Sequence, residues 1–109
     1  MASEVLKRKT IRAMTNAENT LLTAAAGHTY TVLNISLCET GAAAETFDLY
    51  VRDDAGANDF YIYKAQALAA NATFEHTTRL VMEATDVLYG ITGDSADVDV
   101  VITYLDQTL

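Results

Sequence analysis

The sequence predicts an all-β fold: a single antiparallel β-sandwich of about eight strands, jelly-roll-like or immunoglobulin-like. Apolar and polar residues alternate with a period of two along most of the chain, which is typical of strands buried on one face. Clusters of Gly, Asp, Asn and Ser separate these stretches at roughly 8–12-residue intervals, the spacing of short strands joined by tight turns. The 109 residues have room for one domain, and a composition that is 50% hydrophobic and 20% charged belongs to a folded one.

The chain begins with two short candidate strands and continues into a long one. The candidates cover 4–13 and 19–24, and the long strand covers 29–39. Within the long strand we expect Leu33, Ile35 and Leu37 to share the buried face, with polar residues between them on the other face.

Two strands rich in aromatic residues follow, at 46–52 and 60–65. We expect three tyrosines to lie on their outer face, opposite the aliphatic residues: Tyr50, Tyr61 and Tyr63. A tyrosine has an apolar body and a polar tip, so it suits a partly wet contact between subunits. The sequence therefore predicts an oligomer interface at these residues; the alternative is that they only fill exposed positions of twisted strands.

The second half of the chain contains three short candidate strands and a strong final one. They cover 72–77, 79–84, 86–92 and 98–105. In the final strand, Val98, Val100, Ile102 and Tyr104 are predicted to point inward. Leu88 and Val101 are expected on the outer face, which is then apolar enough to favour contact with a neighbour.

An alanine-rich segment favours a helix by propensity alone. Residues 64–72 contain five alanines, but nine residues are too few for a stable isolated helix. We expect 66–71 to be a connection with at most one helical turn.

Charge is distributed unevenly along the chain. Residues 1–12 hold four basic residues and one acid, which gives them a net charge of +3. The remaining 97 residues have a net charge of −11, so the whole chain has a net charge of −8. An acidic body repels phosphate backbones, which argues against nucleic acid as a partner. We predict that Lys7, Arg8, Lys9 and Arg12 contact an acidic partner, the alternative being a solvated strand. Residues 1–14 are expected to form an N-terminal arm or an edge strand, and 15–109 the β-sandwich.

No catalytic residue, metal ligand or cofactor is predicted. The two histidines, His28 and His76, lie in no recognisable nucleophile, phosphate-binding or zinc motif. We expect His76 to be a surface or partly packed strand residue and His28 to be structural or solvent-facing. The single Cys38 cannot form an internal disulfide or a cysteine-based metal cage. Two groups of acids are interpreted as solvated turn residues, with calcium as the alternative: Asp53/Asp54/Asp59 and Asp94/Asp97/Asp99. No apolar run is long enough to span a membrane as a helix, and no secretion signal is expected.

The order of these features resembles that of small β-sandwich virion proteins of tailed bacteriophages. The resemblance rests on TNAENTLLTAAAGHTYTVLNISLCET (15–40), TFDLYVRDD (46–54), DFYIYKAQALAANATFE (59–75) and RLVMEATDVLYGITGDSADVDVVITYLDQ (79–107). It implies a non-enzymatic virion structural protein, foremost a capsid decoration (cement) protein that binds and stabilises the shell. Its expected partners are the major capsid protein or other virion proteins, with assembly as a homo-trimer or another small homo-oligomer.

A different class of function also fits the pattern. The chain is alternatively a small tail- or fibre-associated module, or one that binds a receptor or carbohydrate. Such a module would hold its site in the loops 39–46, 53–59 and 93–97, which we expect at one end of the sandwich.

Overall fold

The fold consists of β-strands and their turns. The computed structural model describes residues 3–54 and 57–108, and within these ranges it contains nine strands and no helix. The strands are β1 (Ser3–Met14), β2 (Asn19–Thr23), β3 (His28–Glu39), β4 (Glu45–Arg52), β5 (Asp59–Leu68), β6 (Thr73–His76), β7 (Leu80–Met82), β8 (Val87–Thr92) and β9 (Val98–Thr108).

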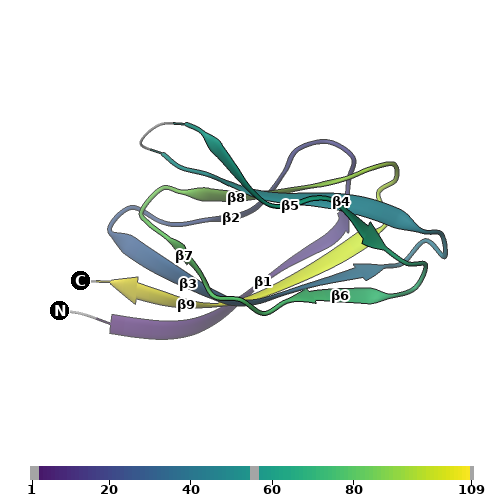
Figure 1. Ribbon diagram of the computed structural model, residues 1–109. Helices are drawn as coiled ribbons and strands as arrows, with labels where there is room; N and C mark the ends of the chain where they lie inside the picture. The colour runs from purple at the N-terminus through teal and green to yellow at the C-terminus, as the bar shows by residue number, and fades with distance from the viewer. Residues whose placement is uncertain (1–2, 55–56, 109) are drawn as a thin grey trace.

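Two antiparallel sheets pack face to face (Figure 1). Sheet A has the order β1-β9-β3-β6, with β7 also paired to β3, and sheet B has the order β2-β8-β4-β5. Because β6 and β7 pair with successive parts of β3, they occupy one strand position between them. The chain passes back and forth between the sheets, and the first and last strands lie side by side, which is the arrangement of a jelly roll. The predicted all-β sandwich is confirmed.

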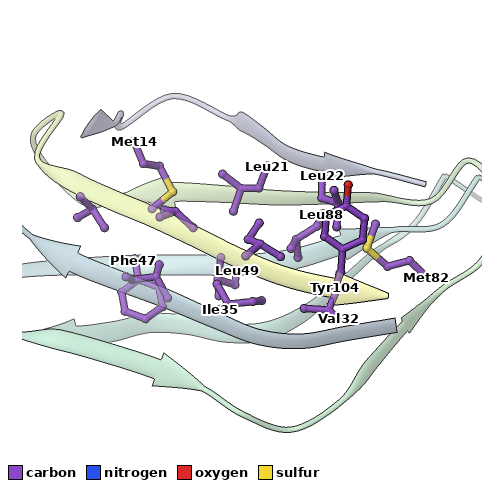
Figure 2. Close-up of a cluster of buried hydrophobic side chains, with 14 of the residues drawn as sticks. Met14, Leu21, Leu22, Val32, Ile35, Phe47, Leu49, Met82, Leu88 and Tyr104 are labelled. Carbon is purple, nitrogen blue, oxygen red and sulfur yellow. The ribbon is translucent and has the colours of Figure 1, made fainter. Parts of the chain in front are cut away.

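The core fills the space between the two sheets (Figure 2). The final strand contributes as its alternation predicts, because Val98, Val100 and Ile102 are no more than 1% exposed and Tyr104 is 8% exposed. From sheet B, Phe47 and Leu49 of β4 and Leu88 of β8 point toward them. The expectation that Leu88 lies on the outer face is wrong: it is fully buried and pairs with Val51 across the β4–β8 ladder.

An irregularity in β3 changes which of its residues face inward. The register with β9 shifts between Val32 and Asn34, so one residue is added to β3 at Leu33. The strand therefore buries Ile35 and Leu37 beyond the shift and Val32 before it, while Leu33 is only half-buried. The prediction that Leu33 shares the core face with Ile35 is wrong for this reason.

A second irregularity affects β5. Tyr50 pairs with Tyr61, but Leu49 pairs with Tyr63, so β5 gains one residue at this point. Leu49 points into the core, and its partner Tyr63 follows it inward. Tyr61 and Tyr63 consequently lie on opposite faces, which corrects the expectation that they share the outer one.

The alanine-rich segment is a strand for most of its length. β5 continues to Leu68, whose side chain is 3% exposed, so the predicted connection at 66–71 is wrong for its first half. Pairing of Thr46 with Ala67 and of Glu45 with Leu68 extends the ladder this far, and tertiary pairing overrides alanine's helix propensity. The turn that follows closes with a hydrogen bond from the N–H of Ala72 to the carbonyl of Ala69.

Candidate functional site

The basic residues near the start of the chain lie on an edge strand. β1 pairs with β9 from Ser3↔Thr108 to Met14↔Val98, and no described strand lies on its other side. The first part of β1 is open on both faces, since Val5 is 48% exposed and Leu6 is 66% exposed. This strand is the longest free sheet edge in the described part of the chain.

One of the four predicted contact residues is engaged inside the domain. The Nζ of Lys7 donates to Oδ2 of Asp106 at 2.7 Å, and Nδ1 of His28 lies 2.6 Å from Oδ1 of the same carboxylate. Asp106 is 4% exposed, and the hydrogen bonds from Lys7 and His28 hold the pKa of its carboxyl below its usual value. Lys7 therefore anchors β1 to β9.

The other three basic side chains have no such partner. Arg8, Lys9 and Arg12 are exposed and form no ion pair with any described residue. Arg8 lies opposite Thr103 on the outer face of sheet A, and Lys9 lies opposite Ile102 on the other face. The free edge is thus flanked by cations on both faces.

The outer face of sheet B carries a row of three tyrosines. The ring centroids of Tyr61 and Tyr50 are 4.9 Å apart, and those of Tyr50 and Tyr89 are 5.5 Å apart, so the row crosses β5, β4 and β8. Tyr50 is nevertheless only 2% exposed. Among the predicted interface residues, only Tyr61, which is 48% exposed, has a large accessible surface, and it adjoins the 57% exposed Phe60.

A charged network covers Tyr50. Its hydroxyl donates to the Glu18 carboxylate, and Arg52 donates to Glu18 at 3.0 Å and to Asp59 at 2.7 Å. Burial, together with the Glu18 carboxylate, raises the pKa of the Tyr50 hydroxyl, which therefore stays a donor. The Arg52 guanidinium also lies 4.6 Å from the ring centre of Tyr89. Neither Tyr89 nor Phe60 is predicted from the sequence as a surface residue. For Tyr89 a signal exists, because it follows the buried Leu88 and neighbouring strand residues point to opposite faces.

Tyr63 and the two histidines have structural partners. The hydroxyl of Tyr63 is 2.9 Å from Nδ1 of His76, and the ring of Tyr63 packs against Phe74 on the core side. His76 is 6% exposed, while His28 is held by Asp106. No described serine, threonine or cysteine side chain is hydrogen-bonded to either imidazole.

The loop acids do not gather at one place. Loops 39–46 and 93–97 share one end of the sandwich, but 53–59 joins β4 to β5 at the opposite end (Figure 1). The expectation that all three loops lie together is wrong, because β4 crosses the full sheet between them. Asp59 pairs with Arg52, and Asp99 accepts the N–H of Ala13 at 2.8 Å. Within the described ranges, no group of side chains has the arrangement of a metal site.

Three carboxyl groups lie close together at the first of these ends. Glu39 is 1% exposed and accepts the N–H groups of Asn71, Gly41 and Ala43 at 2.7–3.2 Å. These donors outweigh burial and lower its pKa. Glu39 thereby ties the β5–β6 turn to the β3–β4 turn.

Glu45 holds the β8–β9 loop in the same way, through hydrogen bonds from backbone N–H groups. It is 7% exposed and accepts the N–H groups of Ser95 at 3.1 Å and Thr46 at 3.0 Å. Burial acts to raise its pKa, but the backbone donors prevail and lower it. The β8–β9 loop is held to β4 in this way.

Asp97 lies between these two glutamates. Burial and the carboxyl groups of Glu39 and Glu45 raise the pKa of Asp97 to about 6. Its Oδ1 is buried without a hydrogen-bond partner among the described residues. The sequence places all three acids near turns, but not in contact.

Comparison with known proteins gives similarity in structure only. No family model matches the chain, and no curated protein is similar to it in sequence. Within the described ranges, no helix has the length and apolarity needed to cross a membrane.

Chains from one viral particle and two phage capsids share the fold. A chain of the T13 IBDV viral particle superposes with a TM-score of 0.58 at 10% identity, over 97% of this chain but only 31% of that one. A chain of the acid-stable capsid of Helicobacter pylori bacteriophage KHP30 gives a TM-score of 0.54 at 14% identity, over 97% of this chain and 92% of that one. A chain of the cyanophage Pam1 capsid gives 0.51 at 17% identity, over 99% and 86%. The chain therefore has a jelly-roll fold like that of viral capsid proteins.

Proposed function

We propose that this chain is a non-enzymatic structural protein of a phage virion, and that it binds the capsid shell as a decoration (cement) protein. The observation that carries the proposal is the large share of each phage capsid chain that superposes on this one. Chains from the KHP30 and Pam1 capsids are covered over 92% and 86% of their lengths, so in each a single jelly roll makes up most of the chain, as it does here. A domain of this kind is suited to adding to a lattice.

The described side chains support a binding role over catalysis. Both histidines are held by structural partners, and the buried carboxylates of Glu39 and Glu45 are occupied by backbone donors. Catalysis by acid or base needs such a group to reach a substrate in an open site.

The surface that suits shell binding is β1. Arg8, Lys9 and Arg12 project from an edge next to the exposed Val5 and Leu6, while the rest of the protein is acidic. An acidic site on the shell would attract this strand and be repelled by the remainder of the molecule, which fixes the orientation of the bound protein. Lys7 would support this surface from within.

A second surface suits contact between copies of the protein. Tyr61 and Phe60 are consecutive exposed aromatic residues of β5, and they project from opposite faces of this edge of sheet B. Stable interfaces bury about 1,200–2,000 Å² in total, so a protein of this size would supply its share most readily as a small oligomer. Many copies bound to one shell then act together.

The test is co-sedimentation with shells assembled from the major capsid protein encoded together with this chain. The wild-type protein should sediment with the shells, and Arg8→Glu/Lys9→Glu should stay in the supernatant. Deletion of β1 is a poor alternative because it removes a whole strand of sheet A. The single variants Arg8→Glu and Arg79→Glu form a matched pair, since they make the same charge change but Arg79 lies in the connection between β6 and β7. Arg8→Glu should sediment less than the wild type, and Arg79→Glu should sediment like it. Failure of the wild-type protein to bind any such shell would refute the proposal.

A further inference from the structure

The free edge of β1 has the features of a docking site for another strand. A strand with a neighbour on one side only leaves every second N–H and C=O directed outward, and native proteins usually shorten, bend or cover such edges. Here the register with β9 is unbroken from Ser3 to Ile11, so the edge stays regular over that length. The edge is also one of the most exposed parts of the described chain.

Side chains next to this edge define the chemistry of its partner. Arg8, Lys9 and Arg12 present positive charge without compensation from any described residue. Leu6 on one face and Val5 on the other offer apolar contacts near the start of the strand. A partner strand that matches this edge carries carboxylates along most of its length and small apolar residues at one end.

A second copy of this protein is a poor match for the same edge. Two copies related by a two-fold axis would pair their β1 strands antiparallel, which brings the basic cluster of one against that of the other. Like charges on paired strands are destabilising. The net charge of −8 on each copy adds a longer-range repulsion.

We propose that the free edge of β1 binds an extended acidic segment of a partner protein by strand addition. The segment becomes a further strand of sheet A beside β1, and its carboxylates pair with Arg8, Lys9 and Arg12. This deepens the proposed function and rests on it only for the identity of the partner as a shell protein. Backbone hydrogen bonds supply affinity in this mode of binding, and the charges select the acidic sequence.

The test uses the whole protein and a synthetic peptide as long as β1, in which pairs of Glu alternate with Val-Thr pairs, so that both faces of the added strand carry carboxylates. Binding is measured by titration calorimetry, and amide exchange of β1 is followed residue by residue by NMR. Binding should slow exchange at every second amide between Ser3 and Ile11, namely those that face the free edge. Arg8→Glu/Lys9→Glu should weaken binding by at least about tenfold, and added salt should weaken it as well. Of the matched single variants, Arg8→Glu should bind more weakly than the wild type, and Arg79→Glu should bind like it.

Other results would overturn the proposal. These are no binding, equal binding of a peptide with Lys in place of Glu, or binding that leaves exchange in β1 unchanged. Self-association that protects the same amides without peptide would assign the edge to a second copy, and it also counts against the proposal. Co-sedimentation with shells is measured separately, so a failed peptide experiment leaves the proposed decoration role standing or falling on its own result.

Discussion

The Nζ of Lys7 lies 2.7 Å from Oδ2 of Asp106, a carboxylate that is 4% exposed and belongs to the strand beside it. This ion pair joins β1 to β9, the first and last strands of the jelly roll. It divides the basic cluster into one structural residue, Lys7, and three residues free to meet a partner. The division gives opposite expectations for neighbouring lysines.

Lys7→Met should lower the free energy of unfolding at neutral pH, and Lys9→Met should leave it unchanged. Asp106 has a lowered pKa in the folded state, so its contribution is present above its unfolded value, near 3.8, and disappears as the pH falls below it. The difference between Lys7→Met and the wild type should therefore shrink in acid. Urea unfolding at pH 7 and pH 3 measures both effects, and equal behaviour of the two variants at pH 7 would contradict the assignment.

Asp97→Asn should stabilise the protein at neutral pH. The folded-state pKa of about 6 lies above the ordinary value of 3.8, so the folded state holds a proton that the unfolded chain has already released. Stability due to Asp97 is thus fully present below pH 3.8 and is lost as the pH rises through about 6. We expect the substitution to add about 1–2 kcal/mol at pH 7 and little at pH 4. Asp94→Asn, in the exposed part of the same loop, should change neither value.

The wild-type protein should have a stability maximum in mildly acidic solution. Glu39 and Glu45 have lowered pKa values, so their contributions are present above 4.5 and are lost as the pH falls below it. Asp97 acts in the opposite direction, since its contribution is lost as the pH rises. Thermal unfolding followed by circular dichroism should give the highest midpoint near pH 5, and a midpoint that rises steadily from pH 5 to pH 8 would exclude the role given to Asp97.

Tyr50→Phe should destabilise the protein more than Tyr89→Phe does. The Tyr50 hydroxyl is buried and donates to Glu18, whereas the hydroxyl of Tyr89 has no hydrogen bond within the described residues. Loss of one such bond to a charged acceptor costs about 1.5–3 kcal/mol, and the change at Tyr89 should fall within about 0.5 kcal/mol of zero. Guanidinium unfolding of both variants is the measurement. Equal losses would mean that packing of the tyrosine row, and not the Glu18 bond, stabilises this face.

The strands could be predicted from the sequence because alternation is a local property. β9 shows this best: each residue predicted to point inward, from Val98 to Tyr104, is buried. The faces of Leu33 and Tyr63 could not be predicted, since a one-residue bulge reverses the faces on either side of it. Nothing in the local pattern marks where such a bulge falls, because the partner strand decides it.

The candidate site was predictable in position but not in detail. The basic cluster is visible in the order of residues 7–12. The separate role of Lys7 depends on Asp106, which is 99 positions away along the chain. Tyr50 was likewise expected at an interface, but Arg52 and Glu18 cover it, and Glu18 belongs to a turn 32 residues earlier. Contacts of this range follow from the topology, so they emerge only when both sheets are in place.

Gly90→Ala should destabilise the core through overpacking. A Cβ on Gly90 would lie 2.6 Å from Sδ of Met14 and 2.8 Å from Cδ1 of Leu21, so both side chains must move. Insertion of this kind costs about 1–3 kcal/mol. Met14→Ala alone leaves a cavity and should cost about 2–5 kcal/mol.

Combined with Gly90→Ala, the Met14→Ala change should cost less than it does alone, because the new methyl group occupies part of the vacated space. A double-mutant cycle by urea unfolding measures this coupling, which we expect to be about 0.5–3 kcal/mol in the favourable direction. Strictly additive effects would show that Met14 and residue 90 do not compete for the same volume.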